Sequence, residues 1–240
     1  ELRAYQTLFR EKPMQVQRIT LPVANSYLLS YKNGYVLVDT GKPGDMPRLA
    51  HALASAGASF TDVTHIIHTH GHSDHCGSTA EIIAAYPHIQ TVIHTGDAHM
   101  CTNGVSDPVH NTRLFSRLLR LVINPRFPQF TNDSVMQGER SNLLRQLGIA
   151  ADIIHTPGHT PGSISIVADD GQAIIGDVLM GGILGGKLLA QRPAYHYYVT
   201  NMDELRMSIT RLLETNSQTF YVGHGGPLSR HRVAAWFGRR

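Results

Sequence analysis

A six-residue segment of the chain is dense in side chains that bind metal ions. Residues 70–75 read His-Gly-His-Ser-Asp-His, so His70, His72, Asp74 and His75 lie within one short turn. Imidazole nitrogens and carboxylate oxygens are the ligands that borderline cations such as Zn²⁺ prefer. A solvated, histidine-rich loop is the alternative. Further histidines and aspartates occur downstream, next to glycines and prolines that mark turns, and these favour a metal site.

A metal held by such a cluster points to hydrolysis. Free water ionises with a pKa of about 15.7, whereas metal-bound water can reach about 7. A site with two cations therefore keeps hydroxide available at neutral pH. The cations also polarise a carbonyl oxygen, so a Gly-x-Ser-x-Gly nucleophile elbow is not required.

The downstream candidates lie in segments bounded by glycine and proline. His159 stands within Thr-Pro-Gly-His-Thr-Pro-Gly-Ser at 156–163, Asp177 follows Gly176, and His224 lies between two glycines. Such residues mark turns between regular elements. The elements on either side must therefore bring these turns together with residues 70–75.

The hydrophobic pattern supplies elements that could do so. Alternation and β-branched residues predict strands, a spacing of three to four residues predicts helices, and Asn33-Gly34 predicts a hairpin. The predicted strands are 14–21, 26–31, 35–38, 63–68, 91–94, 149–155, 163–167, 172–175 and 220–222, and the predicted helices are 47–56, 79–85, 202–213 and 232–237. This order predicts a layered α/β sandwich with its helices outside and one cleft at the sheet edges. Strand 63–68 would deliver the histidine cluster to that edge.

Length and composition bound the remaining possibilities. A chain of 240 residues with 42% hydrophobic content can bury one core, and we expect one domain over 1–240. No apolar run approaches the roughly 20 residues that a transmembrane helix needs. The net charge of +3 is mild, and the lysines and arginines are scattered along the sequence apart from a few arginines at 113–126. No nucleic-acid partner is therefore expected.

The cysteines and the first residue bear on localisation. Cys76 and Cys101 could form at most one bridge, which favours a reducing compartment, and we expect a cytoplasmic protein. The chain opens at Glu1 rather than Met, which is compatible with removal of a presequence.

These motifs, taken in order, resemble those of the metallo-β-lactamase fold superfamily. His70-x-His72-x-Asp74-His75, the 156–163 turn, Gly176-Asp177 and Gly223-His224-Gly225 match its signature, as does Val38-Asp39-Thr40-Gly41 upstream. The resemblance covers about 26–228. It implies a four-layer αββα sandwich whose metals lie in a groove between two sheets.

The resemblance also assigns ligands to two divalent ions. One ion would be held by His70, His72 and His159, and the other by Asp74, His75 and His224, with Asp177 bridging both. Two cations about 3.5 to 4 Å apart need such shared anionic ligands. Zn²⁺ is the expected metal, although Fe²⁺ and Mn²⁺ accept the same ligands. Asp39 resembles a residue that orients the ligands through hydrogen bonds.

Within the superfamily, the chain is most similar to the glyoxalase II and lactonase branch. That branch implies hydrolysis of a carboxylic ester, thioester or lactone, in which hydroxide between the ions attacks the carbonyl carbon of a small acyl substrate and Asp74 orients it as a catalytic residue. Metallo-β-lactamases themselves usually carry Cys or Ser at the position of Asp177, so antibiotic hydrolysis is disfavoured. A phosphodiesterase or nuclease, a persulfide dioxygenase with one iron, and a non-catalytic metal-binding protein remain alternatives.

Three further segments invite interpretation. Residues 181–187 imitate a phosphate-binding loop but lack its Ser or Thr, so we expect a mobile glycine-rich loop beside the metals. Tyr195, His196, Tyr197 and Tyr198 are candidate substrate-binding residues, with aromatic packing as the alternative. Apolar residues at 111–124 predict an inserted amphipathic helix, which could roof the groove, form a homodimer contact, touch a membrane surface, or simply pack on its own domain.

Overall fold

Two six-stranded sheets form the centre of the molecule. The structure is a computed structural model that describes residues 13–108, 110–112 and 124–239. The first sheet contains, in spatial order, β1 (Gln15–Thr20), β2 (Asn25–Tyr31), β3 (Gly34–Val38), β4 (Val63–Ile67), β5 (Gln90–His94) and β7 (Ser134–Met136). The second contains β16 (Leu228–Ser229), β15 (Thr219–Tyr221), β11 (Gln172–Ile174), β10 (Ile164–Ala168), β9 (Ala151–His155) and β8 (Arg140–Ser141).

Several strands, such as β3 and β9, are buried on both faces, and their side chains alternate between two apolar layers. In β3, Val36 and Val38 contribute to the core between the sheets, whereas Leu37 points into the outer core of the first sheet. In β9, Ile153 faces the central core and Ile154 faces the outer core of the second sheet. Burial on both faces explains why β3 is a continuous apolar run in the sequence.

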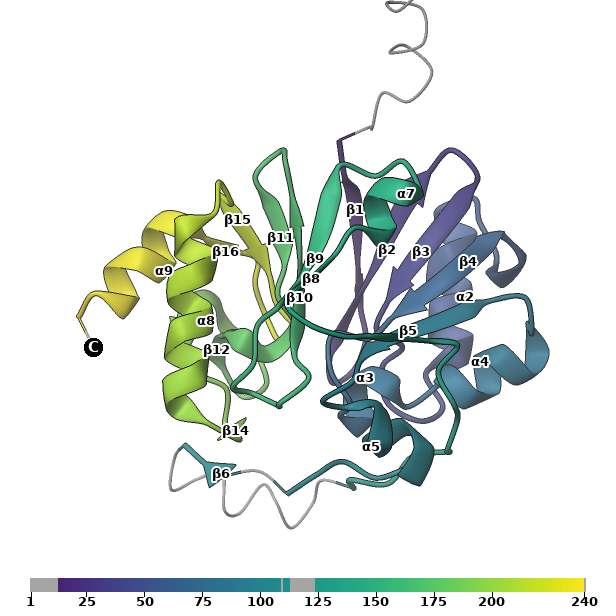
Figure 1. The fold of residues 1–240 in the computed structure, drawn as a ribbon, viewed down its shortest axis with the longest axis horizontal. Coiled ribbons are helices and arrows are strands. Elements are labelled where there is room, and N and C mark those ends of the chain that lie inside the picture. Colours follow the sequence, from purple (N-terminus) through teal and green to yellow (C-terminus); the bar gives the residue numbers. More distant parts are fainter. Residues whose placement is uncertain (1–12, 109, 113–123, 240) are drawn as a thin grey trace, which may run out of the picture.

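Helices cover the outer faces of both sheets (Figure 1). α2 (Met46–Ser55) and α4 (Thr79–Ala85) pack on the first sheet through Leu49, Leu53 and Ile82. α8 (Met202–Glu214) and α9 (Arg230–Phe237) pack on the second through residues that include Leu205 and Trp236. The order helix, sheet, sheet, helix confirms the predicted αββα sandwich. Among the described residues, no helix is long and apolar enough to cross a membrane.

Short elements connect the layers. Three brief helices are α3 (Ser73–Cys76), α5 (Ala98–Asn103) and α7 (Leu143–Gln146), and two 3₁₀ turns are η1 (Phe60–Asp62) and η2 (Gly176–Val178). Two small antiparallel pairs are β12 (Met180–Ile183) with β13 (Leu188–Ala194), and β14 (Tyr198–Val199) with β6 (His110–Asn111).

One prediction about these connections is wrong. The glycine-rich segment 181–187 is part of the β12–β13 hairpin rather than a free loop, with Met180 paired to Ala194 and Ile183 paired to Leu188. Glycine content suggested a loop, but here the glycines permit close backbone contact. The predicted helix of 111–124 falls mainly on residues 113–123, which lie outside the described residues.

The two halves meet where the strands of both sheets end. The backbone N–H of Ile164, at the start of β10, donates to the carbonyl of Thr69, which follows β4, over 2.8 Å. Asn25 Nδ2 donates to the carbonyls of Val222 and Gly225 in the segment after β15. These bonds fix the connecting segments of one half against those of the other, and the candidate site lies there.

Candidate metal centre

The predicted ligands lie on segments that follow strands of both sheets. His70 and His72 follow β4, and Asp74 and His75 lie in α3 directly afterwards. From the second half, His159 lies between β9 and β10, Asp177 in η2, and His224 after β15. All of these side chains are buried except Asp74, whose side chain is 28% exposed. Asp74 therefore marks the side of the cluster that is open to solvent.

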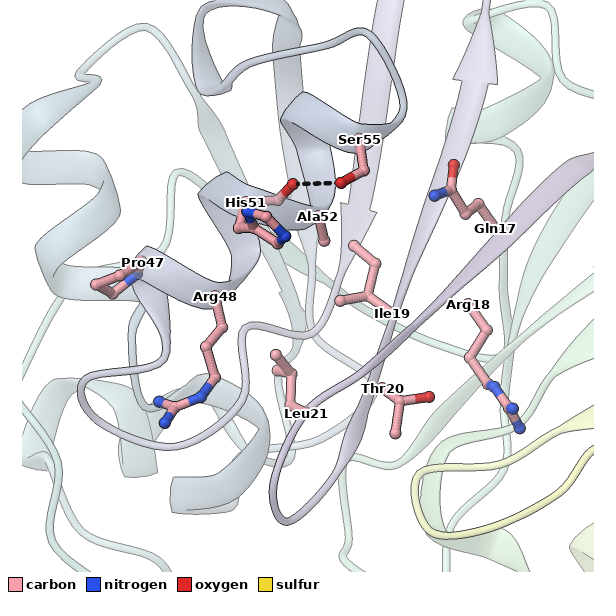
Figure 2. Close-up of a pocket in the computed structure, with 10 residues that line it drawn as sticks. All are labelled: Gln17, Arg18, Ile19, Thr20, Leu21, Pro47, Arg48, His51, Ala52 and Ser55. Atoms are coloured by element: carbon pink, nitrogen blue, oxygen red, sulfur yellow. Dashed lines mark hydrogen bonds between the residues drawn. The ribbon is translucent and has the colours of Figure 1, made fainter.

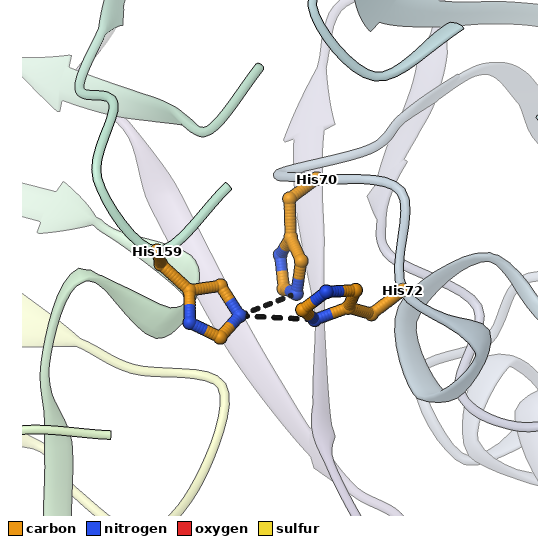
Figure 3. Close-up of side chains that lie close together, drawn as sticks. All are labelled: His70, His72 and His159. Carbon is orange, nitrogen blue, oxygen red and sulfur yellow. Dashed lines mark hydrogen bonds between the residues drawn. The ribbon is translucent and has the colours of Figure 1, made fainter. Parts of the chain in front are cut away.

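Three imidazoles form the first group of the cluster (Figure 3). The Nε2 atom of His159 lies 3.2 Å from Nε2 of His70 and 3.0 Å from Nδ1 of His72. Nitrogens bound to one tetrahedral Zn²⁺ at about 2.0–2.1 Å are about 3.3 Å apart. The group therefore matches the spacing of three ligands on a single ion.

Hydrogen bonds on the far side of two of these rings turn them toward the cluster. Nδ1 of His159 lies 2.8 Å from the carbonyl oxygen of Tyr198 and donates its proton there. This leaves the lone pair of Nε2 directed into the cluster. Nδ1 of His70 lies 3.0 Å from the hydroxyl of Thr69. Such outer partners fix the tautomer and the orientation of metal-binding histidines.

Asp74, His75 and His224 form the second group. Nε2 of His224 lies 3.4 Å from Oδ2 of Asp74. Nδ1 of His224 donates to the carbonyl of Val23 over 3.0 Å, and Nδ1 of His75 lies 2.7 Å from Oδ2 of Asp39. Both imidazoles therefore present Nε2 to the cluster. Asp39 thus makes a hydrogen bond of the kind expected of it, to the ring of His75.

Asp177 lies between the two groups. Its Oδ2 atom is 3.5 Å from Nε2 of His159 on one side, and 3.5 Å and 3.3 Å from Nε2 of His75 and His224 on the other. A residue with a Cβ at position 223 would collide with the Asp177 carboxylate, so Gly223 is required for this approach. One carboxylate is thus within reach of both groups.

The two groups differ in charge. Burial and neighbouring imidazoles hold the pKa values of His70 and His159 well below 6.5, and burial lowers the pKa of His72 to about 4. Burial acts the same way on His75 and His224, but carboxylates outweigh it. Asp177 and Asp39 raise the pKa of His75 well above 6.5, and Asp177 and Asp74 raise the pKa of His224 to about 10.

Three buried polar atoms support a cation in this cluster. Within the described part of the chain, Nε2 of His75, Nε2 of His224 and Oδ1 of Asp177 have no hydrogen-bond partner. A buried polar group without a partner costs about 1–3 kcal/mol. A coordinated cation would satisfy such atoms, so this donor set fits divalent metal ions.

A buried aspartate that the sequence did not single out holds the two halves of the site together. Asp97 accepts hydrogen bonds from Gly71 N–H over 2.9 Å, from Gly162 N–H over 2.7 Å and from the Thr160 hydroxyl over 2.6 Å. Gly71 directly follows His70 in the sequence, and Thr160 and Gly162 follow His159. Asp97 follows strand β5 in the sequence, and that position is the only signal that could have indicated its role.

Of the four predicted substrate-binding residues, His196 presents its side chain to the cluster. Its Nε2 atom lies 3.2 Å from Oδ2 of Asp177. Tyr195 packs against Trp236 with ring centroids 4.8 Å apart, and Tyr197 accepts the Leu184 N–H through its hydroxyl over 2.9 Å. Tyr198 contributes its backbone carbonyl, described above. For Tyr195, the structure therefore agrees with the alternative interpretation, aromatic packing.

Four other histidines lie outside this cluster and are hydrogen-bonded or stacked. Nε2 of His68 lies 3.2 Å from the hydroxyl of Thr79, and Nδ1 of His65 lies 2.9 Å from the hydroxyl of Thr64. His94 and His155 stack with centroids 4.0 Å apart. The thiol of Cys76 is buried.

One surface hollow is separate from this cluster (Figure 2). It is an open depression of about 710 Å³ between β1 and α2, lined by residues that include Arg18 and Arg48. The two guanidinium groups point apart, and each has a protein partner: Arg18 donates to the Gly226 carbonyl, and Arg48 pairs with Asp45. No group of His, Cys, Asp or Glu able to hold a metal lies among its lining residues, all of which the structure describes. The histidine cluster is therefore the candidate site.

Comparisons with known proteins agree with this geometry. The family model described as "Metallo-beta-lactamase superfamily" matches residues 19–224. The probable metallo-hydrolase MJ0888 of Methanocaldococcus jannaschii is 31% identical over 206 residues, covering 84% of this chain and 87% of the relative. The probable metallo-hydrolase YflN of Bacillus subtilis is 26% identical, covering 89% of this chain and 85% of the relative.

A solved structure shows the same fold. BJP-1, a subclass B3 metallo-β-lactamase of Bradyrhizobium japonicum, superposes with a TM-score of 0.64 at 18% identity, covering 97% of this chain and 93% of that one. At this identity, the likeness concerns the fold alone.

Proposed function

The chain belongs to the metallo-beta-lactamase superfamily, and we propose that it hydrolyses carboxylic esters, thioesters or lactones with two divalent metal ions. One ion would be held by His70, His72 and His159, the other by Asp74, His75 and His224, with Asp177 shared between them. The single observation that carries this proposal is the position of Asp177 Oδ2 between the two imidazole groups, 3.5 Å from both His159 and His75.

The side chains divide the work of the reaction. When bound, the metal ions supply Lewis-acid activation of water and of the carbonyl oxygen. Asp74 is the partly exposed carboxylate of the cluster, and the His224 and His75 imidazoles hold its pKa well below 3.8 against the opposing effect of burial. It is therefore ionised at neutral pH and can accept a hydrogen bond from the attacking water and orient it.

An apolar hairpin beside the cluster supports an acyl substrate. The β12–β13 hairpin follows Asp177 and packs on the segment of His224, with the Gly181 N–H donating to the His224 carbonyl over 2.8 Å. Its tip carries four exposed aliphatic side chains, Ile183, Leu184, Leu188 and Leu189. Exposed apolar clusters of this kind mark binding surfaces. An acyl chain is a better match for this tip than the phosphodiester of a nuclease substrate.

A substrate screen after defined metal loading tests the proposal. Metal-free protein is reloaded with Zn²⁺, Mn²⁺ or Fe²⁺ and offered lactones, thioesters, simple esters and phosphodiesters. We expect metal-dependent release of carboxylate from the acyl substrates. Faster turnover of phosphodiesters would favour a nuclease, and oxidation of a persulfide by protein that contains one iron per chain would favour a dioxygenase.

A further inference from the structure

His196 lies against the candidate metal centre although it belongs to none of the motifs that predicted it. We propose that His196 is an additional metal ligand, which binds one of the two ions through Nε2 beside His159 and Asp177. This inference rests on the proposed two-metal centre and adds an eighth side chain to its seven ligands.

The position of the His196 ring supports direct binding. The ligand atoms of His159, Asp177 and His196 all lie within 4.8 Å of one another, a spacing that one cation could bridge. The ring of His196 is perpendicular to that of His159, with centroids 4.6 Å apart, and lies 5.2 Å from the ring of His224. His196 is buried, with 8% of its surface exposed. It therefore belongs to the cluster rather than to the solvent-facing surface around it.

The hydrogen bonds of the ring allow the tautomer that a ligand needs. Nδ1 of His196 lies 3.2 Å from the carbonyl oxygen of Tyr198 and 3.3 Å from its N–H. With its proton on Nδ1, the ring donates to the carbonyl and presents a lone pair at Nε2. With its proton on Nε2, it donates to Asp177 instead. Once cations engage the Asp177 carboxylate, the first tautomer satisfies both ring nitrogens, whereas the second competes with the cations for that carboxylate.

The backbone holds His196 in place without help from a metal. The Thr112 hydroxyl donates to the His196 carbonyl over 2.7 Å, and the Thr112 N–H donates to the Tyr197 carbonyl over 2.9 Å. On either side, Tyr195 packs on Trp236 and Tyr197 accepts from Leu184. A ligand held by such contacts is preorganised, since little conformational freedom is lost on binding.

An eighth ligand would change which metal the centre prefers. Structural and catalytic Zn²⁺ sites are most often four-coordinate, whereas Mn²⁺ and Fe²⁺ accept more ligands. An imidazole added to His159 and Asp177 raises the coordination number of one ion. We therefore expect this centre to hold Mn²⁺ or Fe²⁺ better, relative to Zn²⁺, than the same centre without His196.

Cobalt substitution tests the assignment without relying on activity. The metal-free full chain is loaded with two equivalents of Co²⁺, and its visible spectrum is recorded together with proton NMR of the exchangeable, contact-shifted N–H signals of coordinated imidazoles. The variants are His196→Gln, His196→Ala and a control, His231→Ala, which removes an exposed histidine on α9. Thermal melting of each variant checks that it folds.

A ligand role predicts a specific loss. Both His196 variants should lose one contact-shifted imidazole N–H signal and change the intensity of the d–d bands, whereas His231→Ala should match the wild type. Identical signal counts and spectra in wild type and His196→Gln would overturn the assignment. If Ala fails to fold, the Gln variant alone decides. Binding of one Co²⁺ rather than two would instead contradict the two-metal function, and the signal count would still decide the role of His196.

Discussion

The Nδ1 atom of His75 lies 2.7 Å from Oδ2 of Asp39, a carboxylate carried by a residue with φ of +60°. The same carboxylate accepts the N–H of Thr69 over 2.8 Å and its hydroxyl over 2.7 Å. Left-handed backbone is uncommon outside glycine, although Asp and Asn adopt it more readily than other residues. The strained residue thus fixes both the start of the ligand loop and the direction of His75.

Replacing this carboxylate should weaken one ion more than the other. Asp39→Asn keeps the size and tolerates the backbone conformation, but its amide can no longer act as a charged acceptor for both Thr69 and His75. Loss of such an orienting partner typically costs about 10–100-fold in metal affinity. Competition titration with a chelator should show this loss for the second ion, while Asp170→Asn, an exposed carboxylate, leaves both affinities unchanged. Equal weakening of both ions would contradict the assigned role.

Substitutions in the two groups should have different effects on metal content and turnover. His72→Ala removes one of three nitrogens from the first group, so metal content and hydrolysis should fall together. Asp74→Asn changes a residue of the second group and should lower both the metal occupancy of that site and turnover. His70, His72 and His159 should still hold an ion. Metal analysis of the purified variants alongside initial rates checks this. Unchanged turnover in either variant would count against the assignment.

Metal uptake should depend on pH differently at the two groups. In the metal-free protein His75 and His224 are protonated at pH 7, because their pKa values are raised, that of His224 to about 10. A cation must displace these protons, so affinity at the second group should rise with pH below 10. His70, His72 and His159 are already neutral, and affinity there should fall only as pH approaches 4, the pKa of His72. Calorimetry in buffers of different ionisation enthalpy counts the protons released on metal binding. The same pH dependence of affinity for both ions would refute the predicted difference between the groups.

Asp97 should contribute strongly to stability. Asp97→Ala leaves the donors of Gly71, Thr160 and Gly162 without their acceptor in a buried position, at a cost of about 3 kcal/mol in the free energy of unfolding. Urea denaturation measures this loss. Asp107→Ala is the matched control, since Asp107 forms a partly exposed pair with His99, and such pairs contribute about 0–1 kcal/mol. Losses of equal size would show that Asp97 does not hold the two halves together.

The hairpin tip should set the preference for acyl chain length. Leu184 and Leu189 both have φ of +53°, so substitution by Asn removes apolar surface without adding backbone strain. Loss of about 1 kcal/mol of apolar contact corresponds to a roughly fivefold lower kcat/KM for long acyl chains. Short-chain substrates should be unaffected. Met207→Gln on helix α8, which removes another exposed apolar side chain, serves as the control. A uniform effect on all chain lengths would exclude a binding role for the tip.

Much of the fold was predictable because its signals are local. The strand predicted at 35–38 corresponds to β3 (Gly34–Val38), and the helix predicted at 202–213 corresponds to α8 (Met202–Glu214). Burial on both faces made β3 a continuous apolar run, and α8 shows clear helical spacing. The β12–β13 hairpin was missed because its glycines serve contacts with a distant segment around Gly225, which local composition does not reveal.

The site was predictable only where motifs carry it. Residues 70–75 are recognisable by their density of histidine and aspartate, and the turn around His159 is recognisable by its prolines and glycines. Asp97 and the exact position of His196 depend on tertiary contacts: one accepts bonds from both halves of the molecule, and the other is placed by Thr112 and Tyr198. No spacing along the chain encodes such contacts.

The dependence of the hydrolysis rate on bound metal is the decisive test of the two-metal proposal. Metal-free protein is titrated with Zn²⁺ or Mn²⁺, and release of carboxylate from a thioester or lactone is measured at each ratio of metal to protein. We expect no hydrolysis without metal and a maximum rate when two ions are bound per chain. Hydrolysis that persists in the metal-free protein, or that reaches its maximum at one ion and falls with the second, would contradict the proposal.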